Sequence, residues 1–281
     1  MYPILIASSD HHSVLWSNQA LLAIALVLGC ALGPLWMQRL EGIDARRARR
    51  ALLLLVLATL FGGRLHFILN QWPLFQANPW SMLAIWRGGL HAGGAVIALM
   101  LALPLVMRHL ELPIGKFADG LIPTAGLCLF MARVGCFLHG CCFGTLCNLP
   151  WCVSFPHDSQ AYSLHGKMHL IGPQALESLA VHPLQLYFAG VGLALTGMAL
   201  WMHRRKAFDG EIALVAALMF AGSSTVLEFL RADQEGRIYW GPFPQLAWIA
   251  AGLTLATALL LAYAQRSHSQ AGRASGVCRT V

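Results

Sequence analysis

The chain has 281 residues, of which 57% are hydrophobic and only 11% are charged, and its formal net charge is +7. A soluble domain carries about a quarter charged residues, so this composition excludes an ordinary soluble protein and indicates an integral membrane protein. The basic residues cluster in short segments beside apolar runs, and no basic strip with interleaved aromatic residues occurs elsewhere. We therefore expect no nucleic-acid partner.

Seven apolar runs are long enough to cross a bilayer, which takes roughly 20 helical residues. They cover about 14–37, 51–70, 89–107, 117–138, 184–203, 211–230 and 243–264. The first 13 residues lack a basic start and a small-residue cleavage site, so no cleaved signal peptide is expected. The pattern predicts an all-α membrane protein with a single transmembrane catalytic domain over 1–264. It also predicts a disordered polar tail over 265–281.

The distribution of basic residues predicts the orientation of these seven helices. Short cytoplasmic loops carry an excess of lysine and arginine. With seven spans, the basic groups at 39–50, 108–116, 204–206 and 266–279 all fall on one side. We therefore expect the N-terminus outside, the C-terminus in the cytoplasm, and an extracytoplasmic loop over about 139–183.

Five of the eight cysteines crowd this outer loop or its border: Cys136, Cys141, Cys142, Cys147 and Cys152. On the oxidising side of a membrane such crowding favours disulfides, and connectivity cannot be derived from spacing. A metal site and redox-active or reduced thiols stay open as alternatives. Zinc sites prefer closely spaced Cys-x(2–4)-Cys pairs, and the spacing of Cys142 and Cys147 is at the upper limit of that range. We assign no metal ligand and expect no cofactor.

Several charged residues lie within the apolar runs: Arg64, Asp119, Arg133, Glu228 and Arg231. An arginine at a helix centre costs at least ~2.5–3.5 kcal/mol, so it normally faces a cavity or a partner. The three arginines lie in the outward halves of their helices, where guanidinium groups could bind an anionic lipid headgroup bidentately. The alternatives are snorkelling of single arginines and a structural ion pair between Glu228 and Arg231.

Glycine pairs accompany these charges at 62–63, 88–89 and 93–94. Small residues let helices approach closely, which is their commoner role, or leave backbone open to a ligand. His91 lies between two pairs and is a candidate general base, with packing as the alternative. Gln185 should point into the bundle because an amide facing lipid is costly, and Tyr187 fits an interfacial aromatic belt.

Three motifs resemble the bacterial phosphatidylglycerol–prolipoprotein diacylglyceryl transferases, over about Gly62 to Gln245. The family signature Gly/Ala-Arg-x-Gly-Asn-Phe-x-Asn-Gly, closed by a further glycine, corresponds to residues 132–140 and Gly144. The family's His-Pro-x-Gln-Leu-Tyr is matched at 182–187, and its Glu-Phe-x-Arg at 228–231.

The resemblance implies transfer of the diacylglyceryl group from phosphatidylglycerol to the lipobox cysteine of a prolipoprotein, forming a thioether. It implies a multi-pass protein of the bacterial inner membrane whose partners are phosphatidylglycerol, prolipoprotein signal peptides and membrane lipid. It assigns catalysis to Arg133, His91, Glu228 and Arg231. It assigns substrate contacts to Arg64, Gly88, Gly89, Gly93, Gly94, Cys136, His139, Gly144, Gln185 and Tyr187.

The chain departs from the family pattern at several positions. Cys136 and His139 replace two asparagines, Phe188 replaces an acidic residue, Phe220 a tyrosine and Ser224 an arginine. The third-helix motif is also one residue shorter, which moves His91 out of strict register. Two further functions therefore stay open. One is a divergent, non-catalytic or altered-substrate paralogue that binds lipid or a partner, and the other is a thiol or disulfide membrane protein.

Overall fold

A computed structural model describes residues 4–7, 14–83, 89–157, 159–172, 174–232, 239–240 and 243–277. The chain divides into two compact units. Unit 1 comprises Met1–Gly29 with Ala118–Val281, and unit 2 comprises Cys30–Phe117. The single domain over 1–264 stays a prediction.

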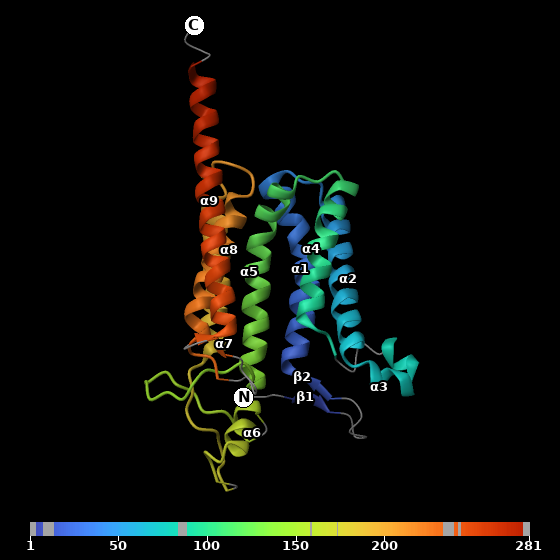
Figure 1. Cartoon of the computed structure of the whole chain (residues 1–281), viewed down its shortest axis with the longest axis vertical. Helices are drawn as coiled ribbons and strands as arrows, with labels where there is room; N and C mark the ends of the chain where they lie inside the picture. Colours follow the sequence, from blue (N-terminus) through green and yellow to red (C-terminus); the bar gives the residue numbers. More distant parts are fainter. Residues whose placement is uncertain are drawn as a thin grey trace. The chain divides into compact units, whose positions relative to one another are not determined.

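The described residues are mainly helical (Figure 1). The helices are α1 (Ser17–Glu41), α2 (Ala45–Asn70), α3 (Trp72–Ala77), α4 (Ala92–His109), α5 (Ile114–His139), α6 (Gln160–Lys167), α7 (Leu184–Met202), α8 (Glu211–Glu228) and α9 (Gln245–Val277), with a short 3-10 helix η1 (Pro79–Leu83). Among these residues six helices, α1, α2, α5, α7, α8 and α9, are long and apolar enough to cross a membrane, and α4 is a shorter apolar helix. The class of all-α integral membrane protein is confirmed. The count of seven spans and their orientation stay predictions.

Two short hairpins and one helix end differ from the sequence prediction. Strands β1 (Ile4–Ala7) and β2 (Val14–Trp16) pair antiparallel, as do β3 (Tyr239–Trp240) and β4 (Phe243–Pro244). The first long helix therefore begins at Ser17 rather than near residue 14. Helix α9 continues to Val277, through most of the predicted disordered tail. Extending an existing helix needs no new nucleus, and the alanine, glutamine and arginine residues beyond 264 favour the helical state.

Unit 2 is organised by a close crossing of α2 and α4. A Cβ atom on Gly62 would lie 2.6 Å from the carbonyl oxygen of Gly94, a separation that real Cβ atoms essentially never show. The backbones of the two helices can approach this closely only because both residues are glycine. For Gly62 and Gly94 the packing alternative of the sequence analysis is therefore confirmed.

In unit 1, α5 packs against both α7 and α8. A Cβ atom on Gly126 of α5 would lie 2.5 Å from the carbonyl oxygen of Gly192 in α7. The hydroxyl of Thr196 donates a hydrogen bond to the carbonyl oxygen of Pro123 at 3.0 Å, one turn away. This contact fixes α7 along α5, so that the end of α5 and the start of α7 lie at the same end of the unit.

Asp119, near the start of α5, joins that helix to the start of α8. Its carboxylate is 2% exposed and accepts hydrogen bonds from the backbone N–H groups of Gly210 (2.8 Å) and Ala213 (2.9 Å). The ammonium group of Lys206 lies 2.9 Å from the same carboxylate. The first N–H groups of a helix have no partner within the helix, and a carboxylate satisfies them while complementing the positive end of the helix dipole. Asp119 is therefore a structural anchor rather than a ligand-binding residue.

Replacing Asp119 with alanine should destabilise the protein by about 3–5 kcal/mol, because it removes the buried carboxylate partner of Lys206 and leaves two helix N–H groups without their acceptor. Thermal unfolding of the purified protein in detergent measures this loss. The matched control is Asp209→Asn, since Asp209 also contacts Lys206, at 3.3 Å, but is half exposed. We expect a change of at most about 1 kcal/mol from the control. Equal losses in the two variants would contradict the anchoring role.

The segment between α5 and α7 folds into a small cap around α6. Its core consists of Phe143, Phe155, Ala161 and Val181, each with 0% exposure. Ser159 caps α6 by accepting a hydrogen bond from the N–H group of Tyr162 at 3.1 Å. In Figure 1 this cap lies beyond the end of α5, next to the start of α7. The predicted loop over about 139–183 is thus a compact structure with its own hydrophobic core.

Candidate functional site

The backbones of three distant segments meet at the end of α5. The N–H group of Gly144 donates to the carbonyl oxygen of His182 at 2.9 Å, and the N–H group of Thr145 donates to that of Leu230 at 2.7 Å. A Cβ atom on Gly144 would lie 2.7 Å from the Cβ atom of His182 and 2.8 Å from the oxygen of Leu230. No side chain fits there, which explains why the motif closes on glycine. This junction brings the three sequence motifs of unit 1 together.

Arg133, near the end of α5, is held by an aromatic ring. Its guanidinium carbon lies 4.5 Å from the centroid of the buried Phe188 ring of α7, which in turn contacts Phe220 of α8. Within the described ranges Arg133 forms no hydrogen bond or ion pair. A cation–π contact fixes the plane of the guanidinium group without using its five N–H donors. Arg133 is therefore oriented and still able to bind an anion.

Glu228 and Arg231 form an ion pair at the end of α8. The separation between the Glu228 carboxylate and the Arg231 guanidinium is 3.9 Å, and the Glu228 side chain is 9% exposed. The backbone of Arg231 pairs with that of Gly144. The ion pair that the spacing of three residues offered as a structural alternative is present, and it lies at the junction of the three motifs.

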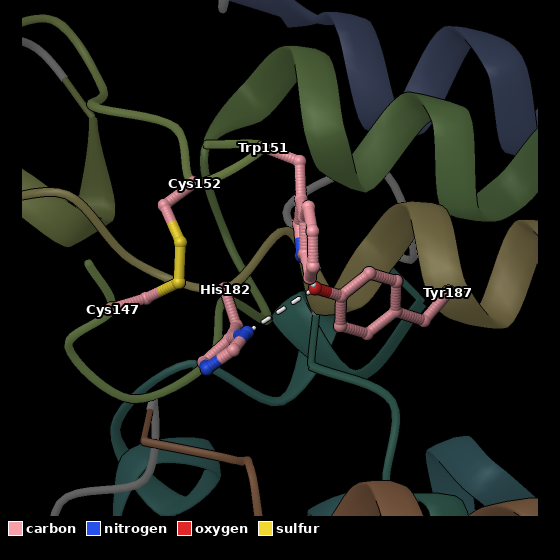
Figure 2. The surroundings of a disulfide bond; sticks show 5 residues. All are labelled: Cys147, Trp151, Cys152, His182 and Tyr187. Atoms are coloured by element: carbon pink, nitrogen blue, oxygen red, sulfur yellow. Dashed lines mark hydrogen bonds between the residues drawn. A yellow bond between two sulfur atoms is a disulfide. The ribbon is translucent and has the colours of Figure 1, made fainter. Parts of the chain in front are cut away.

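The polar residues of α7 point to the same junction. Gln185 has 0% exposure and its side-chain amide donates to the carbonyl oxygen of Cys141 at 2.6 Å, so the prediction that Gln185 faces the bundle interior is confirmed. Figure 2 shows the Tyr187 hydroxyl between Trp151 and His182. The Trp151 indole N–H donates to this hydroxyl at 2.9 Å, and the His182 ring nitrogen lies 3.2 Å from it. Tyr187 thus connects α7 to the cap rather than standing alone in an aromatic belt.

The five clustered cysteines separate into two groups. Cys147 and Cys152 form a disulfide beside His182 (Figure 2), which confirms a disulfide on this loop. Cys136, Cys141 and Cys142 are not in a disulfide, and their sulfur atoms lie within 4.8 Å of one another. Thiol hydrogen bonds from Cys136 and then Cys142, together with burial, raise the pKa of Cys141. The hydrogen bond with Cys136 likewise raises the pKa of Cys142.

Arg64 of unit 2 has a different environment from Arg133. It is 7% exposed, and its guanidinium group donates to the carbonyl oxygens of Ser81 (2.8 Å), Met82 (3.0 Å) and Gly89 (3.0 Å). Its guanidinium carbon also lies about equally far from two phenylalanine rings, those of Phe67 and Phe75. Arg64 therefore holds the segment between α2 and α4 in place.

His91 is the residue immediately before α4, and it is exposed. Its backbone N–H group donates to the carbonyl oxygen of Gly63 at 3.0 Å, and its ring centroid lies 4.1 Å from that of His66. A Cβ atom on Gly93 would lie 3.2 Å from the His66 ring, so small size at this position leaves room for the histidine pair. Gly88, another predicted substrate contact, lies outside the described residues.

His165 of α6 is buried in the cap, with 4% exposure. Its ring nitrogen Nδ1 accepts a hydrogen bond from the N–H group of Leu179 at 3.2 Å, and burial lowers the pKa of His165. Its side chain also lines an apolar cavity of about 340 Å³ together with Phe143, Leu164 and Met168. The neutral form of His165 is therefore the one that fits the cap.

Acidification should loosen the cap through His165. A depressed histidine pKa stabilises the fold fully above the unfolded value of about 6.5, and this contribution is lost as the pH falls through the folded pKa. The loss is at most about 1.4 kcal/mol per pH unit for one proton. Hydrogen exchange of the cap amides at pH 7.5 and pH 5.5 measures it, and His165→Gln should flatten the difference. An unchanged pH dependence in that variant would contradict the assignment.

Several residues described above in the two units were not predicted from the sequence. Phe188 entered only as a departure from a motif, and Trp151 was not considered. His66 carried a signal, because it follows Arg64 by two positions within an apolar run. His165 carried none beyond its presence in the loop, since its role depends on the fold of the cap.

The fold is that of a helical membrane protein with several apolar helices. At one end of its larger unit lie an arginine stacked on an aromatic ring, an ion pair between a glutamate and an arginine, and a cluster of thiols. Comparison with known families gives the narrower assignment. The chain belongs to the prolipoprotein diacylglyceryl transferase family, whose model matches residues 16–263. This confirms the family resemblance identified in the sequence.

The similarity to individual relatives covers most of the chain. The chain is 29% identical over 242 residues to a phosphatidylglycerol–prolipoprotein diacylglyceryl transferase of Ruegeria pomeroyi. This alignment covers 84% of this chain and 79% of that protein. The corresponding protein of Cereibacter sphaeroides is 26% identical over 257 residues, covering 85% and 84%. That of Synechococcus elongatus is 28% identical over 193 residues, covering 69% and 62%.

Proposed function

We propose that this protein transfers the diacylglyceryl group of phosphatidylglycerol to the lipobox cysteine of prolipoproteins at the outer face of a bacterial inner membrane. Family membership and the names of its relatives support this assignment. The observation that carries it is Arg133, which is held in orientation by Phe188 and whose N–H donors remain open among the described residues. A half-buried guanidinium in this state suits a phosphate group.

The proposed reaction is a displacement at the carbon of the diacylglycerol moiety that bears the phosphate. The cysteine sulfur of the prolipoprotein attacks this carbon, the carbon–oxygen bond breaks, and its electron pair leaves with the oxygen of glycerol phosphate. The sulfur loses its proton to a base, for which His91 is the proposed candidate. Negative charge grows on the leaving phosphate, and in this proposal Arg133 and Arg231 stabilise that charge, with Glu228 orienting Arg231.

The remaining predicted contacts receive two kinds of role in this proposal. Gly144 and Gln185 position the loop after α5, and Tyr187 positions the cap, so they shape the headgroup site. Arg64 acts through the backbone segment that it holds, and Gly89, Gly93 and Gly94 keep that region compact. Cys136 and His139, which stand where the family has asparagines, border the headgroup site from the last turn of α5.

The test uses purified protein in vesicles containing phosphatidylglycerol and a synthetic lipobox peptide with one cysteine. We expect mass spectrometry to detect the diacylglyceryl thioether of the peptide and the release of glycerol phosphate. Vesicles of a neutral phospholipid, and a peptide with the cysteine replaced by serine, are the controls and should give no product. In parallel, the protein should rescue a strain depleted of its own diacylglyceryl transferase. No product and no rescue from well-expressed, folded protein would refute the proposed function.

A further inference from the structure

Three thiols gather at the end of α5, and we propose that Cys136, Cys141 and Cys142 bind a thiophilic metal ion of the Zn²⁺ class. Their sulfur atoms all lie within 4.8 Å of one another, and all three side chains are partly buried. The structure joins Cys147 to Cys152 in the same loop and leaves these three as thiols. The cluster borders the proposed headgroup site through Cys136, and its test measures metal binding rather than diacylglyceryl transfer.

The backbone around the cluster ends α5 with a glycine C-cap and then brings the thiols together through a left-handed cysteine. The N–H groups of Gly140 (3.0 Å) and Cys141 (3.2 Å) both donate to the carbonyl oxygen of Cys136, which ends the helix. Gly140 has φ +75°, and Cys142 has φ +58°, in the left-handed region that residues with a side chain rarely adopt. Such a conformation costs roughly 1–3 kcal/mol and clusters at functional sites. Here it folds two consecutive cysteines back onto the last turn of α5.

Contacts on both sides hold this turn in place. The Gln185 amide of α7 donates to the carbonyl oxygen of Cys141 at 2.6 Å. The next residues, Phe143 and Gly144, are fixed by the core of the cap and by the hydrogen bond to His182. The loop is therefore tethered before any ligand arrives. A preformed arrangement of ligands lowers the ordering cost of binding.

The chemistry of three thiols selects a soft metal ion. Thiolates bind Zn²⁺ at about 2.3 Å, which places sulfur atoms about 3.8 Å apart in a tetrahedral site. The present separations need to shrink by at most about 1 Å to reach that value. Zn²⁺ and Cu⁺ are the ions that thiolate sites prefer. The thiols release their protons to the buffer when the metal binds.

The test is metal titration of the full-length protein, purified in detergent with a reductant and freed of metal by a chelator. We expect binding of about one Zn²⁺ per chain in competition with a chromophoric chelator. Co²⁺ in its place should give the thiolate-to-cobalt charge-transfer absorption of a three-thiolate site. A second titration uses Cu⁺ buffered by a Cu⁺ chelator. The ion with the lower dissociation constant is the one that the site prefers. Cys136→Ser, Cys141→Ser and Cys142→Ser should each weaken binding by more than about 100-fold, beyond the loss typical of an outer-shell change.

The matched control is Cys30→Ser, because Cys30 is a thiol outside the cluster, and its affinity should equal that of the wild type. A second measurement needs no variant. Zn²⁺ should protect Cys136, Cys141 and Cys142 of the wild-type protein from alkylation and leave the labelling of Cys30 unchanged. Binding no tighter in the wild type than in the cluster variants would overturn the proposal. So would peptide mapping that finds a disulfide within the trio in protein isolated without reductant.

Discussion

Arg133→Ala is expected to reduce diacylglyceryl transfer by at least about 100-fold, with little effect on folding. One preorganised donor to a developing negative charge is worth roughly 10²–10³ in rate. The stability cost is small because the only ring or polar interaction that the Arg133 side chain makes among the described residues is the cation–π stack on Phe188, which contributes about 0.5–2 kcal/mol. The measurement is initial rate in the vesicle assay together with thermal unfolding of the same preparation.

Arg133→Lys separates charge from geometry. Lysine keeps the positive charge but lacks the planar fork that binds phosphate through two parallel hydrogen bonds. We expect an intermediate rate, above that of alanine and well below that of the wild type. Wild-type rates from Arg133→Ala would refute the role of Arg133. A loss of activity that merely follows a loss of folded protein would do the same.

Arg64→Ala, unlike Arg133→Ala, should cause a large loss of folding stability. The substitution leaves the carbonyl oxygens of the half-buried residues Ser81, Met82 and Gly89 without this donor. Each abandoned acceptor costs about 1–3 kcal/mol, so we expect a loss of at least about 3 kcal/mol. For a chain of this size that lowers the unfolding midpoint by roughly 6–12 °C.

Arg50→Ala is the matched control for Arg64. Arg50 lies on the same helix, is exposed, and should change stability by less than about 0.5 kcal/mol. Limited proteolysis near residues 79–90 provides a local readout, since cleavage there should increase in Arg64→Ala only. If Arg64→Ala were as stable as Arg50→Ala, the structural role assigned to Arg64 would be wrong.

Arg64 and Arg133 show which features of the site could be predicted from the sequence and which could not. Both lie within apolar runs beside glycines, and the cost of burying charge predicted for both a partner or a cavity. That prediction holds, but the partners differ in kind. Arg64 has backbone carbonyls contributed by residues 17 to 25 positions away, and Arg133 has a ring on another helix. Spacing along one helix carries no information on such distant partners.

Other features were predictable because their cause is local. The burial of Gln185 follows from the cost of exposing an amide to lipid, and the Glu228–Arg231 pair follows from a spacing of three residues on a helix. The division of the loop cysteines into one disulfide and one cluster of thiols could not be predicted. It depends on how the cap folds around Phe143 and Phe155, which hydropathy does not record.

The junction at Gly144 also constrains the order in which the chain can mature. Its pairing partners, His182 and Leu230, lie 38 and 86 positions later in the sequence. During synthesis the cysteine-bearing segment emerges first and cannot complete its pairing until α8 has been made. Contacts between such distant positions form late because the intervening chain must first be ordered. The thiols after α5 are thus accessible for an interval before the junction closes, and this interval is when a disulfide catalyst or a metal donor has access to them.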